Sequence, residues 1–269
     1  MNRLVQFGVL LIFAALINGC KQDGIDQKLF INVEDDFYID MFEDISNGEN
    51  HFSFNIQSIN EHECLNTIID YDLQYDGIGN LIVLSINDII SPESCNVGIA
   101  PAFVSIPIEG IQKREYSIEI NLKDVIINNG FLHVTDNDFY LEMSTEDGFE
   151  VVNKQLNKIP KKTIWGYVGY ELESDKVAAE DFIKNVEQNA SNINNSEDYT
   201  SGYYGYFTVL EDYSITLSDE VSNEFHNTFI FQYDEDPLFL TQLMESTCEL
   251  NSGLKIHLFN GEGEVFTCP

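Results

Sequence analysis

The sequence predicts a mostly β protein, in which an N-terminal antiparallel β-sandwich is followed by a two-layer α+β domain, an antiparallel sheet with two helices. Two observations predict this order. Apolar and polar residues alternate with a period of two from about residue 29 to residue 152, whereas apolar residues at helical spacing occur only after residue 163. Hydrophobic residues make up 43% of the 269 residues, which argues against global disorder.

The first half, residues 29–152, is predicted to consist of half-buried strands. Apolar residues alternate with polar ones at 52–56, and the same pattern recurs at 71–75, 118–122 and 139–143. Strands that bury one face show this alternation because successive side chains point to opposite sides. Several short strands at this spacing predict an antiparallel sandwich of immunoglobulin-like size.

Glycine dipeptides mark the expected turns between these strands. Asp76-Gly77 and Asp147-Gly148 separate neighbouring runs, and Asn129-Gly130 lies in the middle of an apolar stretch at 125–134. Asn-Gly and Asp-Gly favour the two-residue turns of β-hairpins. The stretch 125–134 is therefore predicted to be a hairpin.

Residues 153–162 are polar, include Pro160, and are predicted to link the sandwich to a second domain over 163–269. Two stretches there have helical spacing, one after Ser174-Asp175 and one opened by Asp236-Pro237. The expected elements are strand 163–171, helix 175–190, strands 203–210, 213–217 and 228–233, helix 236–250, and strands 255–259 and 264–267. This order favours one antiparallel sheet with both helices on one face.

The N-terminus has the features of an export signal. Arg3 precedes an apolar stretch from Leu4 to Ile17, which is too short to span a bilayer well. Ile17-Asn18-Gly19-Cys20 resembles the lipobox of bacterial lipoproteins. The resemblance implies cleavage of residues 1–19 and acylation of Cys20. The alternative is an ordinary secretory signal with a chance cysteine.

A lipobox implies a protein held on a membrane of the cell envelope, outside the cytoplasm, with the outer membrane as the expected one. Several acyl chains hold a protein stably in the lipid bilayer, whereas one chain holds it weakly. Residues 20–28 are predicted to be a tether between the acylated Cys20 and the sandwich.

Four cysteines remain after Cys20, an even number that fits disulfide bonding in an oxidising compartment. Three pairings are possible, and Cys64–Cys95 with Cys248–Cys268 is favoured because each pair lies within one predicted domain. A zinc site is disfavoured, since no two of these cysteines have the CxxC spacing.

The chain is strongly acidic, with 46 Asp and Glu residues against 13 Lys and Arg and a net charge of −33. This charge excludes a nucleic-acid partner, because few cations could neutralise phosphates. It also argues against docking on anionic lipid through a basic patch. A cationic partner would instead be steered toward the chain.

Asp70, Asp72 and Asp76 are weak candidates for a calcium site. Carboxylates are the ligands that calcium prefers, but the EF-hand spacing and its closing glutamate are missing. The alternative is a solvated strand face followed by a turn.

The sequence offers no catalytic motif. There is no GxSxG elbow, and the five histidines show no HxH or HExxH spacing. His133 and His257 are interpreted as surface residues on strands. The prediction is a non-enzyme without a cofactor, although paired carboxylates leave glycosidase chemistry open.

Two glycine–tyrosine segments are the most distinctive feature of the second half. One is residues 165–170 and the other residues 202–207. One interpretation is a stacking platform for sugars or a partner's side chains. The other is structural: if the two strands pair in one sheet, a tyrosine of one covers a glycine of the other. The candidate stacking residues are Trp165, Tyr167, Tyr170, Tyr203, Tyr204 and Tyr206.

Three functions follow as hypotheses. The first is a lipid-anchored, non-catalytic binding module of the cell envelope. The second is an acidic inhibitor or immunity protein for a basic toxin or hydrolase, which the net charge favours. The third is a surface protein that binds or processes glycans through the tyrosine segments.

Overall fold

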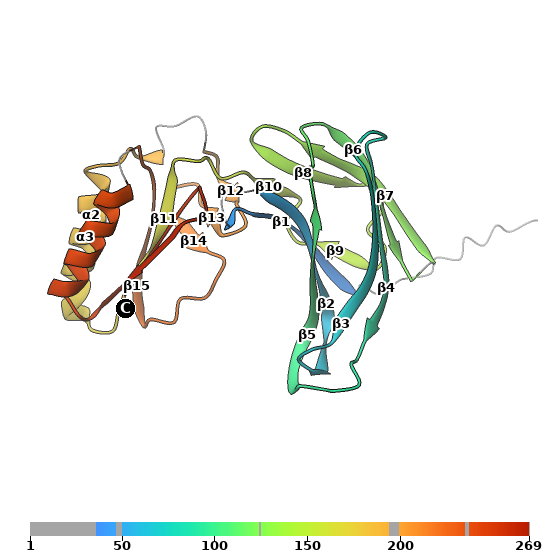
Figure 1. Cartoon of the computed structure of the whole chain (residues 1–269), viewed down its shortest axis with the longest axis horizontal. Helices are drawn as coiled ribbons and strands as arrows, with labels where there is room; N and C mark the ends of the chain where they lie inside the picture. Colours follow the sequence, from blue (N-terminus) through green and yellow to red (C-terminus); the bar gives the residue numbers. More distant parts are fainter. Residues whose placement is uncertain (1–35, 47–49, 124, 194–198, 235–236, 269) are drawn as a thin grey trace, which may run out of the picture. The chain divides into compact units, whose positions relative to one another are not determined.

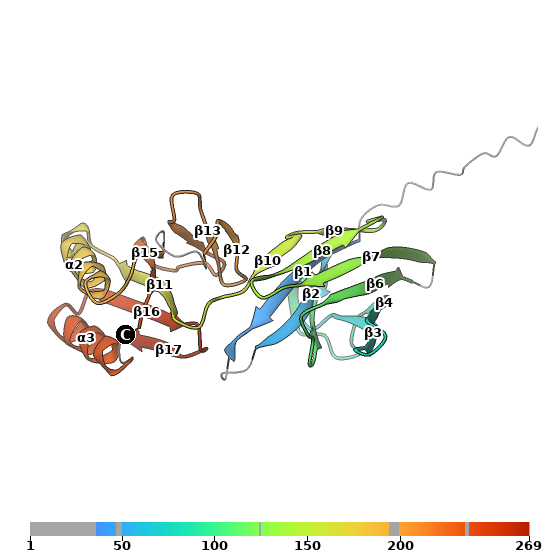
Figure 2. The same ribbon diagram turned by 90° about the horizontal axis from the view of Figure 1, so that it is seen from above.

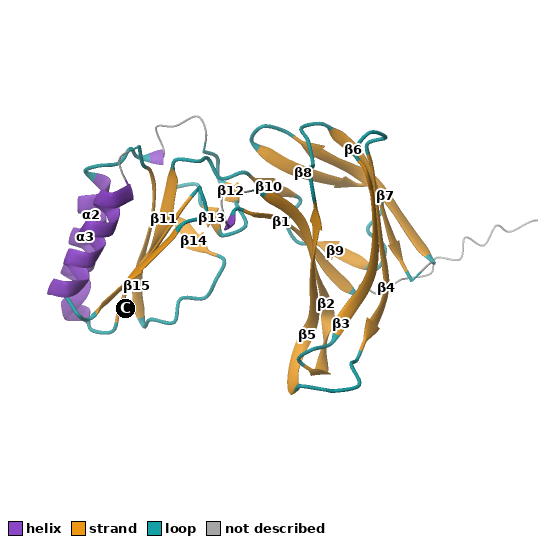
Figure 3. Ribbon diagram, in the orientation of Figure 1, coloured by secondary structure: helices purple, strands orange, loops and turns teal. Residues whose placement is uncertain are grey.

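The computed structural model describes residues 36–46, 50–123, 125–193, 199–234 and 237–268. It is mostly β, with several sheets, a sandwich-like first half and two described α-helices (Figures 1 and 3). No described helix is long and apolar enough to cross a membrane.

The first half of the chain forms two sheets. Sheet A has the order β5-β2-β1-β9, and sheet B has the order β10-β8-β7-β6-β4-β3. The strands of sheet A are β1 (Phe37–Asp44), β2 (His51–Cys64), β5 (Val97–Ile108) and β9 (Phe149–Val151). The strands of sheet B are β3 (Ile68–Asp76), β4 (Leu81–Ile90), β6 (Glu115–Leu122), β7 (Ile126–Val134), β8 (Asp138–Met143) and β10 (Gln155–Asn157).

Sheets A and B share one apolar core, as the period-two alternation predicts. Phe37 and Phe54 of sheet A and Leu84, Ile120 and Leu132 of sheet B are fully buried in the same cluster. Most strand pairs are antiparallel. Two pairs differ from the all-antiparallel prediction, since β4 runs parallel to β6 and β1 runs parallel to β9.

The hairpin predicted at Asn129-Gly130 is wrong, because β7 runs straight through both residues. Gly130 faces the core, and a Cβ added there would lie 2.3 Å from the carbonyl oxygen of Glu142 on the neighbouring strand. The glycine therefore permits a close approach between strands, and it does not form a turn.

The second half contains a four-stranded antiparallel sheet, sheet C, with the order β15-β11-β16-β17. It also contains a small sheet, sheet D, with the order β12-β13-β14. The strands of sheet C are β11 (Thr163–Tyr170), β15 (Phe225–Gln232), β16 (Leu254–Asn260) and β17 (Val265–Cys268). The strands of sheet D are β12 (Gly202–Tyr203), β13 (Phe207–Val209) and β14 (Ile215–Leu217), and the helices are η2 (Glu173–Asp175), α2 (Lys176–Glu187) and α3 (Pro237–Leu250).

Both α-helices cover one face of sheet C, as predicted, and Figure 2 shows them beside each other on that face. Phe182 and Val186 of α2 and Leu240 of α3 pack against Val168 and Ile256 of the sheet. These apolar residues recur at helical spacing, so each helix buries one stripe and leaves its other side to solvent.

Sheet D forms a further layer that the two-layer prediction missed. Phe207 and Val209 of sheet D are buried in one cluster with Trp165 and Ile230 of sheet C, on the face opposite the helices. The strand predicted over 203–210 is interrupted at Gly205, whose positive φ of 82° turns the chain between β12 and β13.

The predicted linker 153–162 contains strand β10, which pairs with β8 at the edge of sheet B. Leu156 of this strand is fully buried in the sandwich core. The described residues belong to one compact unit by their contacts, and the two-domain division stays a prediction.

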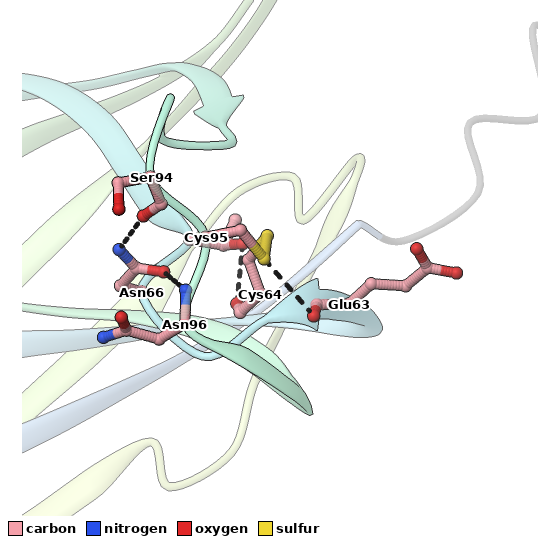
Figure 4. Close-up of a disulfide and its surroundings, with 7 residues drawn as sticks. Glu63, Cys64, Asn66, Ser94, Cys95 and Asn96 are labelled. Atoms are coloured by element: carbon pink, nitrogen blue, oxygen red, sulfur yellow. Dashed lines mark hydrogen bonds between the residues drawn. A yellow bond between two sulfur atoms is a disulfide. The ribbon is translucent and has the colours of Figure 1, made fainter.

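The pairing of the four cysteines is confirmed. Cys64 is bonded to Cys95, 31 residues further along the chain, and Cys248 to Cys268, 20 residues further. Figure 4 shows that Asn66 ties the same segments together: its amide donates to the Ser94 carbonyl and its oxygen accepts from the Asn96 N–H, both at 2.9 Å. The bridge therefore fixes the end of β2 to the loop before β5.

Serine replacement of both Cys64 and Cys95 is expected to lower the free energy of unfolding by about 3–4 kcal/mol, because the open chain gains entropy in the unfolded state. Urea unfolding of the oxidised protein measures this. Serine replacement of Cys248 and Cys268 is the matched comparison, with a shorter loop and a slightly smaller loss. An unchanged unfolding midpoint in the first variant would contradict a structural role for the bridge.

Candidate functional site

The predicted lipidation residue, Cys20, and the tether 20–28 lie outside the described residues. The prediction that they anchor the chain in a bilayer therefore stays a prediction.

The three calcium candidates occupy a strand face and a turn. Asp70 and Asp72 accept hydrogen bonds of 3.3 and 3.1 Å from the same amide, that of Asn87. Asp76 instead accepts the backbone N–H groups of Ile78 and Gly79 at 2.9 and 3.0 Å. Within the described parts of the chain, no group of three or more His, Cys, Asp or Glu side chains could hold a metal ion.

Three of the six candidate stacking residues are buried. Trp165, Tyr170 and Tyr204 are only 2%, 3% and 2% exposed, so they cannot present a ring to a ligand. Tyr167, Tyr203 and Tyr206 are half-buried. A platform made of all six rings is therefore wrong.

The two glycine–tyrosine segments are not neighbours in one sheet, and that prediction is wrong as well. Strand β11 pairs with β15 and β16, whereas β12 and β13 belong to sheet D. The segments meet through side chains: the ring centroid of Trp165 lies 5.8 Å from that of Tyr206 and 5.1 Å from that of Phe207. Gly166 allows β11 to pack closely against β16, since a Cβ there would lie 2.0 Å from the His257 carbonyl oxygen.

Tyr203 and Tyr206 bind carboxylates of β1. The Tyr203 hydroxyl donates to Asp40 at 2.9 Å, and the Tyr206 hydroxyl donates to Asp44 at 3.2 Å. Asn153 adds its amide to Asp40 at 3.2 Å. These bonds hold the hydroxyls of both tyrosines against the sandwich, so the two residues have a structural role.

Burial controls the ionisation of this group. It raises the pKa of Asp40 above its ordinary value of 3.8, although the bonds from Tyr203 and Asn153 act in the opposite direction. Burial and the neighbouring Asp40 charge also raise the pKa of Tyr203. Burial raises the pKa of Tyr206 to about 12, so both hydroxyls stay protonated donors at neutral pH.

Tyr167 and two histidines form a ring cluster on the face of sheet C opposite the helices, in which Tyr167 and His257 are half-buried and His226 is exposed. Tyr167 of β11 stacks on His257 of β16, with ring centroids 4.8 Å apart and planes at 13°. His226 of β15 meets the Tyr167 ring edge-on at 6.4 Å. We call these three residues the Tyr167 patch. Register explains it, because Tyr167 lies directly opposite His257 in the sheet.

An acidic cavity of about 320 Å³ adjoins the Tyr167 patch. His226 lines it, together with Thr228 of the same strand and the carboxylate residues Asp219 and Glu220. The patch and cavity together place two imidazoles, a phenol and two carboxylates in one region of the surface.

Burial favours the uncharged forms of Tyr167 and His257 at neutral pH. Burial, with a smaller effect of the Lys255 charge, lowers the pKa of His257 below its ordinary value of 6.5. Burial also raises the pKa of Tyr167. Tyr167 and His257 can therefore donate and accept hydrogen bonds and stack against a ligand without carrying charge, while the adjoining carboxylates attract cations.

The sequence interpretation missed this patch. The period-two alternation places His257 on a polar-facing position, as predicted, but it does not show that β16 lies beside β11. Only the pairing of β11 with β16 brings together Tyr167 and His257, which lie 90 residues apart in the sequence (257 − 167 = 90).

No family model matches the chain, and no match was found among curated proteins or solved structures.

Replacement of Tyr203 by Phe should destabilise the protein by about 1–3 kcal/mol at pH 7, because it removes a donor from a buried charge. The raised pKa means that ionised Asp40 opposes folding, so the contribution of Asp40 to the free energy of unfolding is fully present below pH 3.8 and is lost as the pH rises through the folded-state pKa. The variant should therefore differ most from the parent at neutral pH and least near pH 3.

Urea unfolding at both pH values measures the effect. The matched control is Tyr167→Phe, because the Tyr167 hydroxyl that this variant removes has no hydrogen bond to a described residue. Equal losses for Tyr203→Phe at both pH values would contradict the proposed link to Asp40.

The imidazole of His257 is expected to titrate below 6.5, because burial disfavours the charged form. Nuclear magnetic resonance of the ring protons measures this. Lys255→Gln should raise the midpoint only part of the way, since burial is the larger cause. A midpoint at or above 6.5 would show that the ring is better solvated than the structure has it.

Proposed function

We propose that this chain is a lipid-anchored protein of the cell envelope that acts as a non-catalytic binding module. The Tyr167 patch is its partner-facing surface. The observation that carries this proposal is that the half-buried Tyr167 and His257 and the exposed His226 form one ring cluster on a sheet whose other face is covered by helices. Rings with polar edges are favoured at protein interfaces, because they combine apolar contact with hydrogen bonding.

The location outside the cytoplasm is supported by two lines of evidence. The segment before Cys20 resembles a lipobox, and two disulfides join the other four cysteines. Structural disulfides persist in oxidising compartments. The acylated Cys20 would hold the chain in a bilayer, with the outer membrane as the proposed one.

The proposal keeps the finer fold assignment made from the sequence. Residues 29–152 would be an immunoglobulin-like sandwich, and residues 163–269 an α+β domain that carries the Tyr167 patch. The two sheets around one core support the first assignment, and the two helices on sheet C support the second.

The charge of the chain favours a cationic partner. The six strands of sheet B contain no lysine or arginine but eight Asp and Glu residues. Asp219 and Glu220 add two carboxylates beside the Tyr167 patch. Opposite charges speed association, so inhibition or neutralisation of a basic toxin or hydrolase is the form of binding that the charge favours most.

Glycan binding through the tyrosine segments is the second candidate. It now rests on Tyr167 and its two histidine neighbours, because Trp165, Tyr170 and Tyr204 are buried. One half-buried tyrosine with two histidines gives a smaller stacking surface than six aromatic rings, which favours a protein partner.

Replacement of Cys20 by Ala is expected to release the chain from the membrane fraction of the producing cell, since no acyl chain can then be attached. Fractionation followed by immunoblotting measures the shift, with Cys64→Ser as a control that changes a different cysteine. A Cys20→Ala protein that still sediments with membranes would contradict the lipid anchor.

A pull-down tests the partner. Full-length protein in detergent is incubated with envelope and secreted fractions at low and high salt. We expect capture of a basic protein that is lost at high salt, because exposed charges are screened there. Tyr167→Ala should abolish capture, whereas Tyr38→Ala, which truncates an exposed tyrosine of β1, should leave it intact. Glycan retained at both salts would favour the second candidate.

A further inference from the structure

A separate cavity of about 620 Å³ lies where the turn between β3 and β4 meets the loop between β5 and β6. Its volume is in the range of small-ligand sites. Its walls include Tyr75, Asp76, Gly77, Gly110, Gln112 and Arg114. None of these residues belongs to the Tyr167 patch, so an inference about the cavity stands apart from the proposed function.

Arg114, the only arginine of the described chain, is fixed in this cavity by neutral groups. Its Nη1 donates to the Gly77 carbonyl at 3.0 Å and to the Asn80 side-chain oxygen at 2.9 Å, and its Nη2 donates to Gln112 Oε1 at 2.5 Å. A guanidinium has five N–H donors, so two are left for a ligand.

The absence of a carboxylate partner is unusual in so acidic a chain. No Asp or Glu of the described residues forms an ion pair with Arg114, whereas the preceding residue, Lys113, pairs with Asp136. The chain has 46 acidic residues against 13 basic ones. Arg114 nevertheless donates only to neutral acceptors, so its positive charge is available to pair with the anionic group of a ligand. Arginine binds carboxylates in a geometry that two parallel N–H groups define.

The remaining walls of the cavity offer space, a ring and an acceptor. Gly110 has a φ of +68°, and nothing lies within 4 Å of the position that a Cβ would take there. Tyr75 places a half-buried ring in the wall. Burial and its hydrogen bond with Tyr116 raise the pKa of Tyr75 to about 12. Asp76 uses Oδ1 for the turn N–H groups, which leaves Oδ2 to accept a hydroxyl.

We propose that this cavity binds a uronic acid, with the sugar carboxylate on Arg114, a ring hydroxyl on Asp76 and the sugar ring against Tyr75. A plain carboxylate would use Arg114 alone. A neutral sugar would leave the cation unpaired. A sugar acid uses the cation, the hydroxyl acceptor and the ring together, and it can be free or the terminal residue of an acidic polysaccharide.

Isothermal titration calorimetry of the full-length protein in detergent tests the site, with glucuronate as the probe and glucose as its neutral counterpart. Glucuronate should bind at least about tenfold more tightly, because a hydrogen bond between charged groups is lost with glucose. Equal affinity for the two sugars, or no measurable binding of glucuronate, would overturn the proposal.

Arg114→Gln should weaken glucuronate binding by about 10- to 100-fold. Lys113→Gln is the matched control, because it removes the same charge from the adjacent residue, outside the cavity wall. Equal weakening by both variants would show general electrostatics and contradict the site.

A second variant guards against misfolding, since Arg114 also holds two loops together. Gly110→Asn should block the cavity, because asparagine tolerates positive φ and fills the open space. Loss of glucuronate binding with an unchanged melting temperature supports the site, and full binding in this variant overturns it. Oligogalacturonate distinguishes the source: a much tighter complex with the same dependence on Arg114 indicates a polysaccharide end, and equal affinity indicates the free sugar acid.

Discussion

The second half of the chain depends on one strand that is buried from both sides. Seven of the eight residues of β11 are buried, with helices against one face and sheet D against the other. A strand in this position must let its neighbours approach closely, and glycine at 166 does so because a side chain would collide with the backbone of β16. Tyr167 is the exception: it is the one residue of β11 that stays half-exposed. The helices and sheet D therefore bury the rest of β11 and leave only Tyr167, with the patch around it, partly exposed.

In this acidic chain, the few carboxylates that are partly or fully buried are compensated by hydrogen-bond donors or by a nearby cation. Asp40 is bonded by Tyr203 and Asn153, so its buried charge has donors. Glu43 is only 7% exposed, and one of its oxygens has no hydrogen-bond partner among the described residues. Burial raises the pKa of Glu43, while the charge of Lys158 acts against that shift. Burial in turn lowers the pKa of Lys158, which lies 4.5 Å from the Phe139 ring centroid. The surplus charge is left at the surface, where it can steer a cationic partner.

Local patterns predicted local structure, and they failed wherever distant segments decide. Alternation identified β2, β3, β6 and β8 of the sandwich, and the position of the cysteines identified both disulfides. The prediction of a turn at Asn129-Gly130 was wrong, because Gly130 is needed for close packing against the neighbouring strand β8. The tyrosine segments misled for the same reason: whether a ring is open depends on the sheet that packs over it, and sheet D covers Trp165 but not Tyr167. His257 was placed on the correct side of its strand, yet its stacking partner could not be found from spacing.

The central claim is that the Tyr167 patch faces the partner. Site-specific photocrosslinking in the producing cell tests it most directly, with a benzoylphenylalanine in place of Tyr167 and, separately, in place of Tyr38. The account predicts a crosslink to one basic protein from position 167 and none from position 38. A crosslink from position 38 alone, or none from position 167 while the labelled protein is folded and exported, would contradict it.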